Sequence, residues 1–177
     1  MRGLSIGMKD RDASVGDEVR PLATHDLPAI MRVQEICYQP SLIEPGEALL
    51  SKMLLFSMGS WGCFSDGELA AYIVCVPAVG DDVIPLGRPA ISLPSRPDRL
   101  YIHDLAVHPA HRGRRIASDL VRKAEDIASW FGHKRLSLVS VQGTELFWSG
   151  QGFEPVHALE YAPGVPATYM VKVVSGT

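Results

Sequence analysis

The feature that most constrains the fold of this chain is a β-strand, a short basic turn and a helix in direct succession over residues 99–130. The segment RLYIHDLAV, residues 99–107, predicts a strand that ends just before Pro109. From residue 116 onward, apolar side chains recur on one face, as in an amphipathic helix, and Gly132 follows as a stop signal. That face comprises Ile116, Leu120, Ala124, Ile127 and Phe131. A strand followed by such a helix favours a sheet with a parallel crossover connection.

The segments on either side predict more strands and helices around this unit. Two β-leaning runs within residues 61–76 flank Ser65-Asp66-Gly67, which is a strong hairpin signal. The other expected elements are a short edge strand at 18–22, helices at 24–38 and 44–57, a strand at 135–141, a short helix at 144–150 and a final strand at 168–174. Residues 77–98 hold five of the 13 prolines and predict a loop. The fold class is therefore α/β, with a mixed (α+β) sheet.

Length and composition suggest one folded domain. The 177 residues, 46% of them hydrophobic, suffice for one core, which we expect over residues 16–177 after a loose N-terminal leader at 1–15. We expect no signal peptide and no membrane-spanning segment, because no long apolar run interrupts the charged residues. Three cysteines without a CxxC pair suit reduced thiols in a cytoplasmic protein. The net charge of −3 argues against a nucleic-acid partner.

The basic turn predicts a site for an anion. His111, Arg112, Arg114 and Arg115 surround Gly113 directly before the helix, where free amide N–H groups and the helix dipole are electropositive. Arginines at that end of a helix repel one another unless an anion neutralises them. Neither the Gly-Lys-Ser/Thr of a Walker loop nor the spaced glycines of a Rossmann fingerprint is present. A local phosphate site fits these residues better than a solvated basic surface.

The segment LAVHPAHRGRRIASDLV resembles the acetyl-CoA signature of the GNAT superfamily of N-acetyltransferases, Gln/Arg-x-x-Gly-x-Gly/Ala after a strand ending in Val-x-Pro. Arg112 stands in the first position of that pattern and Ala117 in the last, whereas Arg115 replaces the intermediate glycine. The segment ELFWSGQGFEPV resembles a later family segment, with Gly152 and Phe153 in place. The resemblance implies a twisted mixed sheet of six to seven strands flanked by about four helices.

The same resemblance implies which residues bind the co-substrate. Acetyl-CoA would lie against the main chain of the strand end and against the turn that opens the long helix. The residues implied are Leu105, Ala106, Val107, Arg112, Gly113, Arg114, Arg115, Ile116, Ala117 and Ser118, with Trp148 packing on pantetheine or on the acceptor. A core position for Trp148 is the alternative.

Two neighbouring residues, His103 and Asp104, are the candidates for the catalytic base. The ordinary pKa of histidine suits proton abstraction near neutral pH, and HDLAV is similar to a run in arylalkylamine N-acetyltransferases. Neighbours in a regular strand point to opposite faces, so both could face a cleft only across a β-bulge. The family places its acidic tyrosine where this chain has Trp148, which leaves water, Tyr101 or Tyr161 to protonate the thiolate.

The resemblance implies direct transfer of the acetyl group to a primary amine, with no metal. His103, Asp104, His108 and His111 match no metal-ligand spacing. The Leu- and Met-rich residues 24–58 favour a small, partly apolar amine, and residues 77–98 would form a lid or a dimer contact. A homodimer is expected by analogy alone. The alternatives are a non-catalytic acyl-CoA-binding or regulatory module on the same fold and, with less support, an RNA-binding domain.

Overall fold

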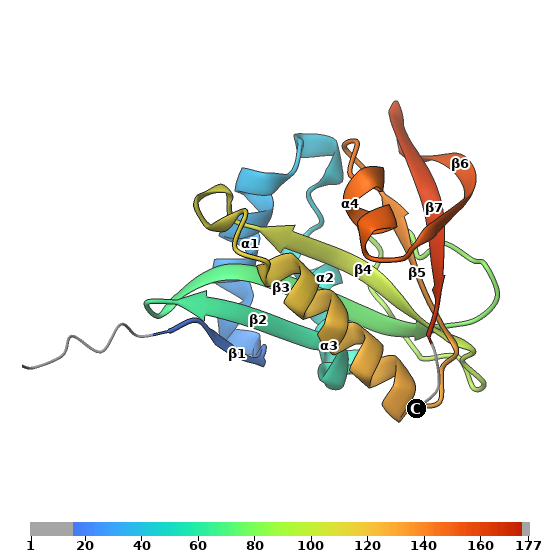
Figure 1. Ribbon diagram of the computed structural model, residues 1–177, viewed down its shortest axis with the longest axis horizontal. Helices are drawn as coiled ribbons and strands as arrows, with labels where there is room; N and C mark the ends of the chain where they lie inside the picture. The colour runs from blue at the N-terminus through green and yellow to red at the C-terminus, as the bar shows by residue number, and fades with distance from the viewer. Residues whose placement is uncertain (1–15, 175–177) are drawn as a thin grey trace, which may run out of the picture.

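One seven-stranded sheet organises the residues that the computed structural model describes, 16–174 (Figure 1). The strands lie in the order β1-β2-β3-β4-β5-β7-β6. Their bounds are β1 Glu18–Pro21, β2 Ser60–Ser65, β3 Glu68–Ala78, β4 Arg99–Val107, β5 Arg135–Ser140, β6 Glu154–Ala162 and β7 Val165–Val173. The predicted leader at 1–15 lies outside the described residues. The mixed sheet confirms the predicted fold class.

Within residues 16–174, four α-helices and four short 3-10 helices connect the strands. The α-helices are α1 Leu27–Cys37, α2 Gly46–Leu55, α3 Ile116–Trp130 and α4 Glu145–Gly150. The 3-10 helices span Thr24–Asp26, Pro40–Leu42, Ser57–Gly59 and Pro109–His111. The bounds of β4 and α3 agree with the strand and the helix that the sequence predicts on either side of the basic turn.

The helices cover both faces of the sheet. Figure 1 shows α3 in front of the strands, with α1 and α2 on the opposite side. Alternate side chains of β3 enter the two resulting cores: Ile73 and Cys75 pack with α3, whereas Tyr72 and Val74 pack with α1 and α2. All four side chains are buried, because a central strand covered on both faces has no solvent side.

The centre of the sheet opens where β4 and β5 diverge. These two strands are the parallel pair of the sheet, and their register covers only Leu100–Ile102 against Leu136–Leu138. Beyond Ile102, β4 continues to Val107 with no partner residue on β5. Main-chain groups on that side of β4 are therefore left unpaired by the sheet, and this divergence positions the candidate site.

Two local predictions have different outcomes. The hairpin between β2 and β3 turns at Asp66 and Gly67, both with positive φ (51° and 81°), as a two-residue turn of type I′ requires. The strand β6 was not predicted, since the sequence analysis placed a single final strand at 168–174. Most side chains of β6 are exposed because it forms the edge of the sheet, so it lacks the apolar pattern of a buried strand.

The proline-rich segment has no regular secondary structure from residue 79 to residue 98, as predicted, whereas Pro77 and Ala78 of the predicted loop belong to β3. Within residues 16–174, no helix is long and apolar enough to cross a membrane.

Candidate active site

Two cavities lie where β4 and β5 diverge. The larger, of about 560 Å³, borders the basic turn and is called the turn cavity here. The smaller, of about 120 Å³, is bordered by His103 and is called the His103 cavity. They share five wall residues, Tyr38, Leu105, Gln142, Thr144 and Phe147. The two cavities are therefore neighbouring parts of one groove that follows β4 from its end towards its middle.

The turn cavity collects the residues that the sequence assigned to acetyl-CoA, except Trp148. Its walls include Leu105, Ala106, Val107, Arg112, Gly113, Arg114, Arg115, Ile116, Ala117 and Ser118. The first turn of α3 lies in this wall, and the leading N–H groups of a helix have no partner within it. The cavity thus combines unpaired amides, a helix N-terminus and three guanidinium groups, which suits a phosphate.

The arginines of the turn differ in how many hydrogen bonds their guanidinium groups already donate. Arg114 donates two hydrogen bonds to Asp17 (2.8 and 2.9 Å) and lies 2.9 Å from Nδ1 of His111. Arg112 donates from Nε to the carbonyl of Val107 at 3.3 Å, which leaves its terminal nitrogens available. Part of the repulsion that the sequence analysis assigned to the cluster is therefore relieved by an acidic neighbour of Arg114.

Arg115 occupies a backbone conformation that favours glycine. It precedes α3 with φ 63° and ψ 5°, and its side chain is exposed. Left-handed backbone costs a residue with a Cβ about 1–2 kcal/mol. An arginine thus adopts here a backbone conformation that costs glycine nothing.

The variant Arg115→Gly is accordingly expected to raise the free energy of unfolding by about 0.5–1 kcal/mol, because relief of the left-handed strain exceeds the added chain entropy. Arg112→Gly is the matched control, since Arg112 is exposed with φ −65° and gains nothing from glycine. Urea denaturation of both variants measures the difference. Equal destabilisation by the two substitutions would contradict the strain.

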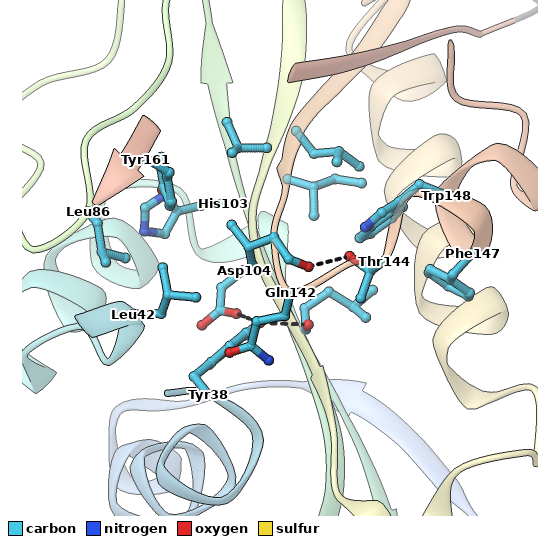
Figure 2. A pocket seen from close by; sticks show the side chains of 15 residues that line it. Tyr38, Leu42, Leu86, His103, Asp104, Gln142, Thr144, Phe147, Trp148 and Tyr161 are labelled. Carbon is cyan, nitrogen blue, oxygen red and sulfur yellow. Dashed lines mark hydrogen bonds between the residues drawn. The ribbon is translucent and has the colours of Figure 1, made fainter. Parts of the chain in front are cut away.

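The His103 cavity is bordered by both candidate bases. The pairing of β4 with β3 shifts between Val74 and Cys75, whose partners are Asp104 and Ile102, so His103 is the extra residue of a β-bulge. His103 and Asp104 consequently both line the cavity (Figure 2). Neither residue therefore has to be excluded as a catalytic group on geometric grounds.

Trp148 lines the His103 cavity instead of the turn cavity. It is buried and packs edge-on against Phe147 and Phe153 (ring centroids 5.0 and 5.3 Å apart). The cofactor role that the sequence analysis gave it would thus be confined to the end of the groove near His103. Its indole N–H can donate a hydrogen bond but releases no proton at working pH.

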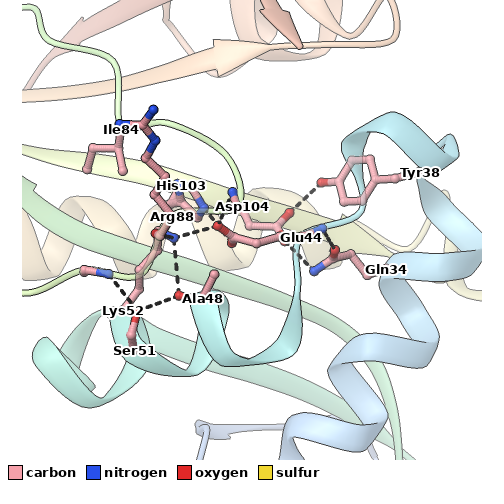
Figure 3. A network of polar contacts seen from close by, with 12 residues as sticks. Gln34, Tyr38, Glu44, Ala48, Ser51, Lys52, Ile84, Arg88, His103 and Asp104 are labelled. Carbon is pink, nitrogen blue, oxygen red and sulfur yellow. Dashed lines mark hydrogen bonds and ion pairs between the residues drawn. The ribbon is translucent and has the colours of Figure 1, made fainter. Parts of the chain in front are cut away.

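A buried network holds the imidazole of His103 (Figure 3). Nε2 of His103 lies 2.8 Å from Oε2 of Glu44, and Oε1 of the same carboxylate accepts a hydrogen bond from Nζ of Lys52 at 2.6 Å. The side chains of all three residues are almost fully buried (0–1% exposed). Buried charges are tolerated only when they are paired, and this carboxylate pairs with both neighbours.

The electrostatics of this network determine which nitrogen of His103 carries the proton. Burial by itself would raise the pKa of Glu44, but His103 and Lys52 outweigh it and hold that pKa below its usual value. An ionised carboxylate only accepts hydrogen bonds, so Nε2 of a neutral His103 must be the protonated nitrogen. Nδ1 then carries the free lone pair, and it has no partner among residues 16–174. The arrangement is that of a histidine base oriented by a carboxylate.

Asp104 belongs to a second network on the opposite side of the bulge. Its Oδ1 accepts a hydrogen bond from the hydroxyl of Tyr38 and its Oδ2 one from that of Tyr72, both at 2.6 Å. The amide of Gln34 lies 3.5 Å from Oδ2. Desolvation raises the pKa of Asp104, although the two tyrosine hydroxyls act in the other direction.

The proline-rich loop is attached to the network of His103. Gly87 N–H donates to Oε1 of Glu44 at 3.0 Å, Lys52 donates to the carbonyl of Arg88 at 2.9 Å, and Leu86 lines the His103 cavity. The loop therefore borders one side of this cavity, and its predicted role as a lid stays a prediction. The dimer contact is the alternative, and it stays a prediction.

The sequence analysis did not identify Tyr38, Tyr72, Lys52 or Glu44 as site residues. Glu44 and Lys52 lie in the Leu- and Met-rich segment that was interpreted as a general wall of the acceptor site. An acid and a lysine eight residues apart in an apolar segment were a usable signal, because buried charges require partners. The two tyrosines gave no signal, since their contacts with Asp104 join residues 66 and 32 positions apart.

Residues 27–153 match the Acetyltransferase (GNAT) family. The chain belongs to this family. The match covers α1 through Phe153, and so includes the turn cavity, the bulge at His103 and Trp148. A GNAT protein uses an acyl-CoA, and the combination of a basic turn at the start of α3 with a diverging strand pair in this chain agrees with that use.

Solved structures of the GNAT fold superpose on nearly the whole chain. The ribosomal-protein-S18-alanine N-acetyltransferase of Escherichia coli is similar at 14% identity, with 92% of this chain and 96% of that chain covered and a TM-score of 0.66. The loading GNATL domain of CurA from Lyngbya majuscula gives 10% identity, 90% and 98% coverage and a TM-score of 0.76. The PaiA N-acetyltransferase of Thermoplasma acidophilum, solved in complex with coenzyme A, is 17% identical, with 90% of this chain and 99% of that chain covered and a TM-score of 0.66. No curated protein sequence matches the chain.

These similarities establish the fold alone, since all three sequence identities are too low to transfer an activity. Proteins with different activities share this fold, because one of the three structures is a loading domain and the other two are N-acetyltransferases. In residues 16–174, no group of three metal-ligating side chains is assembled.

Proposed function

We propose that this GNAT protein transfers the acetyl group of acetyl-CoA directly to the primary amine of a small acceptor. The observation that carries the proposal is the continuity of the groove, which joins the basic turn to a histidine held by a carboxylate along one edge of β4. A phosphate-bearing donor and a proton acceptor are what acyl transfer to an ammonium group requires.

Acetyl-CoA would lie along β4 with its pyrophosphate at the turn. The amides that open α3 and the terminal nitrogens of Arg112 would bind the phosphate oxygens. The main chain of Leu105, Ala106 and Val107, which β5 does not pair, would hold pantetheine and polarise the thioester carbonyl. This places the thioester near the shared wall of the two cavities, within reach of an acceptor in the His103 cavity.

The acceptor amine would lose its proton to Nδ1 of His103. Glu44 keeps Nε2 protonated and stabilises the imidazolium that forms, so the lone pair of Nδ1 stays available for the next cycle. The deprotonated amine then attacks the thioester carbon. The sequence left His103 and Asp104 open as the base. We assign the proton of the acceptor amine to His103, because Glu44 holds its imidazole.

A covalent acetyl-enzyme is disfavoured by the state of the thiol nearest to the groove. Cys37 lines the turn cavity, which the sequence analysis did not anticipate. Its thiol lies 3.3 Å from the carbonyl of Val107, and burial raises its pKa. A thiol that donates to a carbonyl and resists ionisation is a poor nucleophile, so direct transfer to the amine is favoured.

The walls of the His103 cavity support a small and partly apolar acceptor. Besides the polar groups described above, they consist of aliphatic and aromatic side chains, among them Leu42, Leu86, Leu138, Val139 and Phe147. The three free cysteines suit a reducing compartment, and we therefore place the reaction in the cytoplasm. A homodimer remains an expectation by analogy.

Calorimetric titration with acetyl-CoA tests the assignment of the turn. Micromolar binding is expected, and Arg112→Ala should weaken it about tenfold, the effect of losing one charge-assisted hydrogen bond of 1.5 kcal/mol or more. Arg114→Ala should weaken it less, because Asp17 already engages that guanidinium group.

The matched control is Arg122→Ala, since Arg122 is an exposed arginine of α3 that lines neither cavity. Equal affinities for wild type, Arg112→Ala and Arg122→Ala would contradict the phosphate site. An amine screen with thiol detection then follows with the wild-type protein. Binding of acetyl-CoA without turnover of any amine would favour the non-catalytic acyl-CoA-binding module instead.

A further inference from the structure

The hydroxyl of Tyr38 stands at the junction of the two cavities. Tyr38 follows the last residue of α1, and of the five tyrosines in the chain it alone lines both the turn cavity and the His103 cavity. Its hydroxyl oxygen lies 2.6 Å from Oδ1 of Asp104 and 2.9 Å from the carbonyl oxygen of Leu105. One hydroxyl proton therefore has two acceptors within reach, one of them on the strand along which pantetheine would lie.

The proposed reaction has a proton to place at this junction. When the tetrahedral intermediate collapses, the sulfur leaves with the electron pair of the C–S bond and is stabilised by a proton. Trp148, which stands in the family's tyrosine position, releases none. A donor must therefore come from another residue of the shared wall or from solvent.

The other candidates lie in less suitable places. Tyr161 borders only the His103 cavity, and its hydroxyl donates to the carbonyl of Ile84 at 3.2 Å. Tyr101 is 1% exposed and lines neither cavity. The sequence analysis considered these two tyrosines, and the geometry favours Tyr38 over both.

Asp104 can resupply the proton. The carboxyl touches the Tyr38 hydroxyl directly, and a second tyrosine, Tyr72, holds its other oxygen (Figure 3 shows Tyr38 and Asp104 pointing towards each other). Desolvation raises the pKa of this carboxyl group against the opposing effect of the two tyrosine hydroxyls, and the proposed relay requires its protonated form. With a proton on Asp104, the hydroxyl of Tyr38 is free to turn from the carboxyl towards Leu105 or towards a sulfur in the groove.

We propose that Tyr38 is the catalytic acid of this enzyme and that Asp104 is the positioning residue that restores its proton. This inference rests on the proposed function. In the step, the C–S bond breaks and its electron pair stays on sulfur. Sulfur takes the hydroxyl proton of Tyr38, and the oxygen of Tyr38 takes the carboxyl proton of Asp104. Asp104 leaves the step as a carboxylate and regains a proton from water when coenzyme A departs. The acceptor nitrogen loses two protons separately: one goes to His103 before the attack, and the second goes to water as the tetrahedral intermediate becomes the amide.

The first test compares steady-state kinetics of Tyr38→Phe, Asp104→Asn and the double variant with an amine that the wild type acetylates. Each single variant should lose about 100-fold in kcat, which is the lower end of the effect of removing a general acid or base. The affinity for acetyl-CoA should stay unchanged. Because the two residues act as one relay, the double variant should lose no more than either single one. Tyr72→Phe is the control: it removes a contact of Asp104 but lines neither cavity, and should lose far less.

The second test does not depend on turnover. The infrared difference spectrum between wild type and Asp104→Asn at neutral pH should contain the carbonyl band of a protonated carboxyl group, and Tyr38→Phe should shift that band. Wild-type kcat in Tyr38→Phe, or a difference spectrum with no protonated carboxyl band, would overturn the proposal. Failure of the wild type itself to acetylate any amine would instead refute the proposed function, and this inference with it.

Discussion

Replacement of Glu44 with alanine is expected to lower the free energy of unfolding by about 3–5 kcal/mol, the usual cost of removing one partner of a buried ion pair. The loss is large because one carboxylate pairs with Lys52, His103 and the amide of Gly87. Without it, the ammonium group of Lys52 stays buried without a carboxylate partner, and the loop over the His103 cavity loses the hydrogen bond of Gly87. Chemical denaturation followed by circular dichroism measures the change.

Two further variants separate charge from general disturbance of this region. Glu44→Gln keeps the shape and should lose most of the same stability, whereas Glu47→Ala removes an exposed carboxylate of α2 and should change stability by less than about 0.5 kcal/mol. If Glu44→Gln were as stable as the wild type, the ion network would not be a stabilising feature.

The pH dependence of that difference has a defined sign. The pKa of Glu44 is lower in the folded protein than in the unfolded chain. At any pH above the unfolded pKa, the ionised carboxylate therefore contributes its full stabilisation to the folded state. As the pH falls through the folded pKa, the carboxylate is protonated and the benefit is lost. The stability gap between wild type and Glu44→Gln should therefore narrow in acid and stay constant near neutral pH.

The second large effect concerns catalysis: His103→Gln is expected to lower kcat by about 10²–10³, the range for loss of a general base. The affinity for acetyl-CoA should stay unchanged, because His103 borders the small cavity and not the turn cavity. Steady-state kinetics with acetyl-CoA and the acceptor found in the amine screen provide the measurement.

His157→Gln serves as the matched control, since His157 is an exposed residue of the edge strand β6 and lines neither cavity. Its kinetics should equal those of the wild type. Retention of more than a third of wild-type kcat by His103→Gln would remove the histidine from the role of base. Asp104 would then be the remaining candidate for the base whose protonation lowers the rate in acid.

Local sequence signals determined the elements to which we assign the co-substrate. The strand at 99–107, the basic turn and the helix at 116–130 are contiguous, and each is specified by side-chain periodicity, by Pro109 or by Gly132 within a few residues. The residues assigned to the turn consequently line one cavity in the structure. The edge strand β6 escaped prediction because an exposed strand carries no such periodicity.

Only the tertiary structure decided which side chains meet His103 and Asp104. Glu44 reaches His103 across 59 residues and Tyr38 reaches Asp104 across 66, and no local pattern encodes contacts of that span. A one-residue bulge in β4 then brings both side chains to the same cavity, which strand alternation alone would forbid. The sequence by itself thus determined where a phosphate would bind, because helix ends and turns are short-range structures. The placement of the protons depends on long-range packing between α1, α2 and β4.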